Sequence, residues 1–177
     1  MQESVRQVVA QQALTVPVPI DTLIRQYRLK IVVAPMRPGL QSVLTLSTQP
    51  GLVLVNQAMG PWAQRFAIAH EAIHSQYHRS HLHGEEYSHH VYYAYLETEA
   101  NAGAAELLLP YEWFADTARD LLGDRIHTAG DLAAFLASPE ARRWAGQARV
   151  TVSVIGYHLY EVGLVPFRAK PPRLARV

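Results

Sequence analysis

The chain has 177 residues, of which 49% are apolar and 18% charged, and its formal net charge at neutral pH is +1. This length allows one domain with a buried core, and so small a charge imbalance gives no reason to expect nucleic-acid or acidic-membrane binding. Because the chain contains no cysteine, a disulfide framework is excluded, and any metal ion must be held by His, Asp or Glu.

The ends of the chain and its apolar runs bear on location and domain count. The N-terminal residues are polar and charged, with no apolar run of signal-peptide length, and no aliphatic run is long enough to span a bilayer. We therefore expect a cytoplasmic protein with no membrane partner. Residues 1–167 are expected to form a single domain, since no linker divides them. Residues 168–177 hold four basic groups, two prolines and no acid, which indicates a flexible basic tail.

The first half of the chain predicts two helices and a small sheet. Pro17 ends the first helix, and Asp21 marks the beginning of the second. β-Branched residues and a Thr-Gln-Pro-Gly turn then indicate a strand followed by a hairpin, and hence a sheet of about three strands. These expected elements are helices at residues 3–14 and 22–28 and strands at residues 29–34, 41–47 and 51–56.

From Gly60 onward the pattern is helical. Pro61 suits the first turn of a helix, where its missing N–H costs nothing. The apolar stripe of this helix consists of Trp62, Phe66, Ala69, Ile73 and Tyr77. A His-rich loop at residues 79–88 precedes further helices at residues 90–109, 112–122, 131–136, 140–147 and 152–162. The elements predict an α+β fold, with a short three-stranded sheet packed on one functional helix and further helices after it.

Residues 70–74 read His-Glu-Ala-Ile-His. Two histidines four residues apart project from one face of a helix, so both imidazoles can reach a single ion. The carboxylate of Glu71 can point at a water that zinc makes more acidic, and can take its proton. Because His70 and His74 border the apolar stripe, they are expected at the edge of the core. We predict that these histidines are metal ligands and that Glu71 is the catalytic base.

A catalytic zinc needs a third protein ligand, and the helix after the His-rich loop offers Glu97 and Glu99. Helical geometry places Glu97 on a close-packing side, together with Ala100, Asn101, Ala104 and Leu108. Glu99 falls on the opposite side with Gly103 and Glu106. We therefore predict Glu97 as the ligand, Asn101 as a hydrogen-bond partner of a motif histidine, and Glu99 as a solvated charge. Zn²⁺ is the expected ion, with Mn²⁺ or Fe²⁺ as alternatives.

Two segments together resemble the ImmA/IrrE family of zincin-like metallopeptidases. Residues 65–74, with His78 four residues on, resemble the family's RFTxAHExxHxxxH stretch, and residues 97–110 resemble its ExEANxFAAELLMP stretch. The resemblance implies a zincin-like metallopeptidase domain in which Glu97 is the third zinc ligand. It also places Asn101 at the position of the family's supporting Asp or Asn, and His78 is expected to support a ligand.

Two positions depart from the family pattern. Ile73 replaces the Gly common before the second His, and Gly103 replaces the usual Phe. The first is expected to place a bulkier group beside the site, and the second to loosen the packing of its helix. Neither change touches a predicted ligand or the base, so the enzyme interpretation stands.

The resemblance also implies a partner and a role. Characterised members of the family act beside helix-turn-helix repressors and cut them, which releases stress-response or mobile-element genes. The implied function is thus a zinc endopeptidase that cleaves such a repressor, without direct nucleic-acid binding by this chain. The alternative, from another class, is a module on the same fold that binds a repressor or antitoxin without hydrolysing it.

Several groups keep open roles at this point. His81, His83, His89 and His90 form either a second metal site, a pH-sensitive lid, or simply a solvated loop. Tyr92, Tyr93 and Tyr95 offer hydroxyl groups, one of which could stabilise an oxyanion, although packing is the simpler role. The strand at residues 52–56 is either a substrate-binding edge or a core strand.

Overall fold

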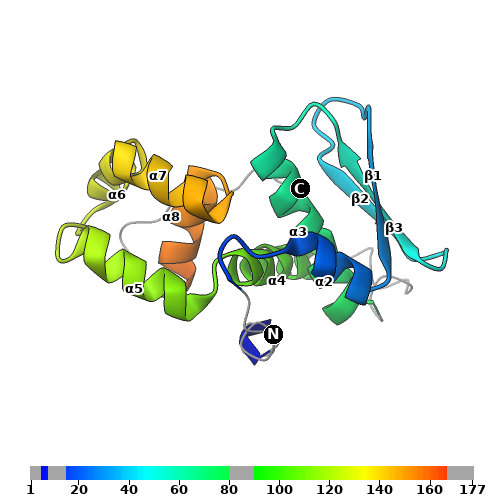
Figure 1. The fold of residues 1–177 in the computed structure, drawn as a ribbon, viewed down its shortest axis with the longest axis horizontal. Helices are drawn as coiled ribbons and strands as arrows, with labels where there is room; N and C mark the ends of the chain where they lie inside the picture. Colours follow the sequence, from blue (N-terminus) through cyan, green and yellow to red (C-terminus); the bar gives the residue numbers. More distant parts are fainter. Residues whose placement is uncertain (1–4, 8–14, 80–89, 167–177) are drawn as a thin grey trace.

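The computed structural model describes residues 5–7, 15–79 and 90–166. A three-stranded sheet lies at one end of the molecule, the helices α3 (Pro61–Tyr77) and α4 (His90–Leu108) lie in the middle, and the C-terminal helices form the other end (Figure 1). This arrangement confirms the predicted α+β fold. Most of the helix predicted at residues 3–14, the tail at residues 168–177, and His81, His83 and His89 lie outside the described residues, as does the side chain of His90.

The sheet has the strand order β1-β3-β2, with β1 at Leu29–Ala34, β2 at Ser42–Thr45 and β3 at Gly51–Asn56. β2 and β3 pair antiparallel, which confirms the predicted hairpin, whereas β1 and β3 pair parallel. β3 therefore has a neighbour on each side and is the core strand. The suggestion that it forms a substrate-binding edge was wrong, because β2 occupies the edge nearer to α3.

α3 begins as the sequence indicates. Gly60 is its N-cap and Pro61 its first residue. One side of the helix packs against β2 and β3 and the other against α4. Its middle, from Phe66 to Ser75, is consequently buried almost throughout, including His70 and His74. The predicted stripe thus places both histidines inside the molecule.

The remaining helices follow the predicted order. Their bounds are α2 Ile20–Gln26, α5 Tyr111–Leu122, α6 Ala129–Leu136, α7 Pro139–Ala148 and α8 Val152–Glu161. α6 starts two residues before its predicted position because the Thr128 hydroxyl and the Asp131 carboxylate form a capping box at its N-terminus. No helix within the described ranges combines the length and the apolar character needed to cross a membrane.

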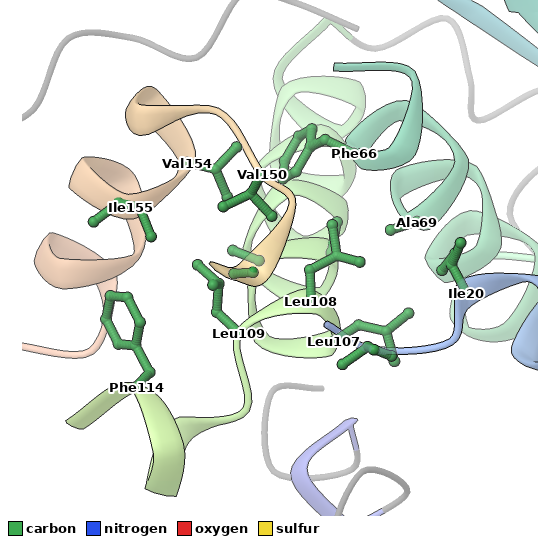
Figure 2. Close-up of a cluster of buried hydrophobic side chains, with 14 of the residues drawn as sticks. Ile20, Phe66, Ala69, Leu107, Leu108, Leu109, Phe114, Val150, Val154 and Ile155 are labelled. Atoms are coloured by element: carbon green, nitrogen blue, oxygen red, sulfur yellow. The ribbon is translucent and has the colours of Figure 1, made fainter. Parts of the chain in front are cut away.

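The core surrounds the C-terminal end of α4. Leu107, Leu108 and Leu109 are fully buried there, between Phe66 and Ile20 on one side and Phe114 on the other (Figure 2). Farther into the C-terminal helices, Phe114 stacks on Trp144 with ring centroids 4.7 Å apart. α4 is therefore held on several sides at once, which fixes the helix that carries Glu97.

The two departures from the family pattern contact each other. A Cβ atom added at Gly103 would lie 3.1 Å from each of three side-chain carbons of Ile73. Ile73 thus occupies the space that a larger residue at position 103 would need, and α3 and α4 stay in close contact. The expectation that Gly103 loosens the packing of α4 was wrong, because the side chain of Ile73 fills that space.

A buried polar cluster lies near the end of α4. The Glu106 carboxylate is 3.2 Å from Arg6 Nε and accepts a hydrogen bond from the Tyr111 amide. His158 on α8 is fully buried, and its Nε2 lies 3.1 Å from the Leu109 carbonyl oxygen, to which it donates. Its Nδ1 is buried, and no described residue offers it a hydrogen-bond partner. Protonation would place an N–H group there with no acceptor, so the geometry favours neutral imidazole.

Stability is expected to depend on pH through His158. Burial, together with the charge of Arg6, lowers its pKa from 6.5 to about 3, against the opposing hydrogen bond to Leu109. Between these values the unfolded chain binds a proton that the folded chain does not, so stability is lost as pH falls below 6.5. The loss is about 1.4 kcal/mol per pH unit. Urea unfolding at pH 7, 6 and 5 measures it.

His158→Gln should reduce this pH slope, since the titrating group is gone. His127→Gln, at an exposed histidine, is the matched control. Equal slopes for wild type and His158→Gln would contradict the prediction.

Candidate metal centre

Three side chains predicted as ligands converge between α3 and α4. The Nε2 atoms of His70 and His74 lie 3.0 Å apart. Glu97 Oε2 is 3.3 Å from His70 Nε2, and Glu97 Oε1 is 3.2 Å from His74 Nε2. Both histidines are buried, and the Glu97 side chain is 20% exposed, so one side of the group remains open to solvent. It is the one His/Asp/Glu group of this kind within the described ranges.

The chemistry and spacing of these donors fit a divalent cation. Ligand atoms about 2.0–2.1 Å from a tetrahedral zinc ion stand roughly 3.3 Å from one another, close to the observed separations. Two imidazole nitrogens that face each other and a carboxylate cannot all present lone pairs without repulsion, unless a proton or a cation lies among them. Two histidines and one carboxylate also form a typical catalytic zinc set, in which a fourth position remains for water or substrate.

The environment keeps Glu97 ionised. Burial alone would favour its neutral form, but hydrogen bonds and the charges of His70 and His74 outweigh burial and lower the pKa of Glu97 to about 2. The carboxylate is therefore available as an anionic donor throughout the physiological pH range.

Asn101 lies behind His70, one helical turn after Glu97. Its Oδ1 is 3.1 Å from His70 Nδ1, and because an amide oxygen only accepts, His70 donates from Nδ1. The Nε2 lone pair of His70 then faces His74 and Glu97. A hydrogen bond of this kind fixes the tautomer and ring orientation that a ligand needs.

His78 lies behind His74 in the same manner. The two Nδ1 atoms are 2.9 Å apart, and His78 Nε2 is 3.4 Å from Glu99 Oε2. A proton donated by His74 Nδ1 to His78 leaves His74 Nε2 as an acceptor, while the Nε2–H of His78 points to a carboxylate. The Glu99 carboxylate lies against His78 and accepts a hydrogen bond from the Tyr95 hydroxyl, so its prediction as a solvated charge was wrong.

The error arose because α4 was divided into one buried and one exposed side. Gly103 contacts Ile73 on α3, and Glu106 is fully buried, although both were placed on the open side. α4 packs against α3 and α8, and Glu106 also meets Arg6, so a two-sided division does not describe it.

Glu71 is buried beside the cluster. Ser42 on β2 donates a hydrogen bond of 2.7 Å to its Oε1. Nothing in the sequence pointed to Ser42, since the two residues are 29 positions apart and lie on different elements. The contact follows only from the packing of β2 on α3.

The tyrosines near the start of α4 do not reveal an oxyanion donor. The Tyr95 hydroxyl donates to Glu99 Oε1 at 2.9 Å, and its side chain is 56% exposed. Tyr93 is also exposed, and the side chain of Tyr92 lies outside the described part of the chain.

The family model of the IrrE N-terminal-like domain, peptidase family M78, matches residues 25–159, which include every residue of the cluster. The chain belongs to this family. Its membership confirms the predicted resemblance and supports a metallopeptidase-like domain. No curated protein sequence matches the chain.

One solved structure shows the same fold. It is a Mycobacterium tuberculosis transcriptional regulator, similar to this chain with a TM-score of 0.64 and 15% sequence identity. The alignment covers 89% of this chain but 45% of that protein, so the IrrE N-terminal-like chain spans less than half of its neighbour's length. At this identity the similarity supports the fold alone.

Proposed function

We propose that the chain is a zinc-dependent endopeptidase. The observation that carries the proposal is the convergence of His70, His74 and Glu97 beside the buried carboxylate of Glu71. The three converging residues would hold the ion, with Asn101 and His78 orienting the two imidazoles. Zinc is the best match to this donor set, and Mn²⁺ or Fe²⁺ are alternatives.

When bound, the ion would supply Lewis acidity, which polarises a substrate carbonyl and makes water more acidic. Glu71 is proposed to take the proton from the attacking water and then to give it to the leaving amine as the C–N bond breaks. The water oxygen and the first proton are both accounted for: the oxygen ends in the new carboxyl group, and the proton that Glu71 carries ends on the leaving amine. The second hydrogen of the water leaves the carboxyl group as a proton at neutral pH, and the new amine takes it up. Glu97 stays ionised because its pKa is about 2.

Two neighbouring features suit a peptide. Among the described strands β2 lies at the edge of the sheet and packs on α3, so an extended substrate could pair with its outer side. A cavity of about 350 Å³ lies at the N-terminal end of α3, where Phe66, one helical turn before His70, forms part of its wall. Leu40, Met59 and Val154 give it a largely apolar lining, which suits a substrate side chain.

The proposed substrate is a helix-turn-helix repressor, cut at one site in the cytoplasm. The support is family membership and the fold shared with a protein described as a transcriptional regulator. The non-hydrolytic alternative rested on the small size of the chain and on the departures at positions 73 and 103. Since Ile73 and Gly103 pack against each other, these departures give it no support.

Purified protein supplied with zinc is expected to cleave the candidate repressor at a single position. Removing the metal with a chelator should stop cleavage, and restoring zinc should recover it. Mass spectrometry of the fragments identifies the bond. Repressor binding without cleavage, at any metal supplied, would overturn the proposal in favour of the binding module.

A further inference from the structure

We infer that Ser42 is a positioning residue that holds the Glu71 carboxylate in its working orientation. The inference concerns the site of the proposed peptidase, and its catalytic consequence rests on that function. The contact between the two residues can be tested without it.

The contact is a short hydrogen bond between two buried side chains. Ser42 Oγ donates to Glu71 Oε1 at 2.7 Å, and both residues are buried, with exposed fractions of 5% and 7%. A hydrogen bond to a carboxylate is stronger than one between neutral groups, and burial shields it from competing water. Within the described residues, Oε2 of Glu71 accepts no hydrogen bond. One oxygen is thus held while the other remains available for a proton.

Ser42 is itself fixed by Asn56 at the end of β3. The backbone N–H of Asn56 donates to the Gln41 carbonyl at 2.9 Å, and its side-chain Nδ2 donates to the Leu40 carbonyl at 2.8 Å. Both acceptors immediately precede Ser42 in the chain. Ser42 also pairs with Val55 in the sheet register. The backbone of Ser42 therefore has little freedom to move away from Glu71.

The same asparagine ties this strand end to α3. Gln64 in the first turns of α3 donates from Nε2 to the Asn56 carbonyl at 3.2 Å. Asn56 is thus hydrogen-bonded both to the segment just before Ser42 and to the helix that carries Glu71. A buried asparagine with this many hydrogen bonds acts as a rigid joint between the sheet and α3. These bonds keep the distance between the Ser42 hydroxyl and the Glu71 carboxylate fixed.

A glutamate side chain that lacks such a contact samples several rotamers, and few of them aim an oxygen at the reacting water. Losing a hydrogen bond to a charged group corresponds to roughly a 10- to 100-fold effect. We expect this loss in kcat, because orientation of the base matters in the transition state, with little change in KM.

The test compares three changes at Ser42 with one control. Ser42→Ala removes the hydroxyl, and Ser42→Cys keeps the side-chain size but leaves a poor donor. Ser42→Thr keeps the hydroxyl. Thr45→Ala on the same strand is the matched control, since the Thr45 hydroxyl bonds with Ser47 at the surface. The probe is a peptide, selected from a casein digest, that the zinc-loaded wild-type chain cleaves.

Ser42→Ala and Ser42→Cys are expected to lower kcat by about 10- to 100-fold, with KM and zinc content within twofold of wild type. Ser42→Thr and Thr45→Ala should keep most of kcat. A kcat within twofold of wild type for both Ser42→Ala and Ser42→Cys would overturn the inference. So would an equal fall in kcat for Thr45→Ala.

A double-mutant cycle gives a readout besides activity. The midpoint of urea unfolding is measured at constant zinc for the full chain, for Ser42→Ala, for Glu71→Ala, and for both changes together. If the residues hold each other, the double variant shifts the midpoint less than the two single shifts together. Additive shifts would mean that Ser42 does not hold Glu71. If the zinc-loaded wild type cleaves neither a casein peptide nor the candidate repressor, the proposed function fails, while this cycle still decides the contact.

Discussion

Replacing Glu71 with Gln is expected to abolish peptide cleavage while leaving the fold and the metal content intact. Gln has nearly the same size, and its amide oxygen can still accept the hydrogen bond from Ser42. What it cannot do is take a proton from water at neutral pH. General base catalysis typically accelerates a reaction by about 10²- to 10⁴-fold, so kcat should fall by at least about 100-fold.

The measurement is kcat for the same peptide or repressor used with the wild type, together with elemental analysis for zinc. Glu112→Gln is the matched control, because Glu112 lies exposed on α5, away from the cluster. It should retain full activity. Cleavage by Glu71→Gln at the wild-type rate would remove Glu71 from the mechanism, and release of the repressor without cleavage would favour the binding module.

Replacing Glu97 with Ala is expected to remove the metal. Wild-type protein should hold about one zinc per chain, since His70, His74 and Glu97 converge at spacings that suit a tetrahedral ion. Losing one of three protein ligands should weaken binding by more than the 10- to 100-fold typical of losing an outer hydrogen-bond partner. Elemental analysis after dialysis measures the content.

Thermal unfolding gives a second measurement of metal binding, because a ligand that binds only the folded chain stabilises it. Zinc that binds only the folded chain should raise the midpoint of thermal unfolding of the wild type, and should do so far less for Glu97→Ala. Glu99→Ala tests the two carboxylates separately, since Glu99 contacts His78, which in turn contacts the ligand His74. It should lose affinity but keep measurable zinc. A wild-type chain that takes up no metal in excess zinc would contradict the metal centre itself.

The parts of the site that the sequence could predict are those set by one helix. The spacing of His70 and His74 places both imidazoles on one face of α3, whatever lies around it. The apolar stripe on that helix also indicated their burial. Glu97 was chosen over Glu99 by the same helical argument, and the structure brings Glu97 to the histidines.

The parts that could not be predicted depend on neighbours far away in the chain. The contact of Glu99 with His78 joins α4 to the end of α3, and no periodicity in α4 encodes it. Glu106 was placed on the side of the helix opposite Glu97, yet Arg6 from the N-terminal segment and the start of α5 enclose it. The hydroxyl of Ser42 reaches Glu71 only because β2 occupies the sheet edge that packs on α3.

The contact between Ile73 and Gly103 affects how the sequence difference between this chain and its family is counted. When a sequence is compared with the family pattern one position at a time, Ile73 and Gly103 count as two separate mismatches. In space they amount to one exchange, in which side-chain volume moves from α4 to α3 across a shared interface. The two unusual residues therefore count as one packing change, and in this chain the three ligand side chains still lie at separations that suit a single ion.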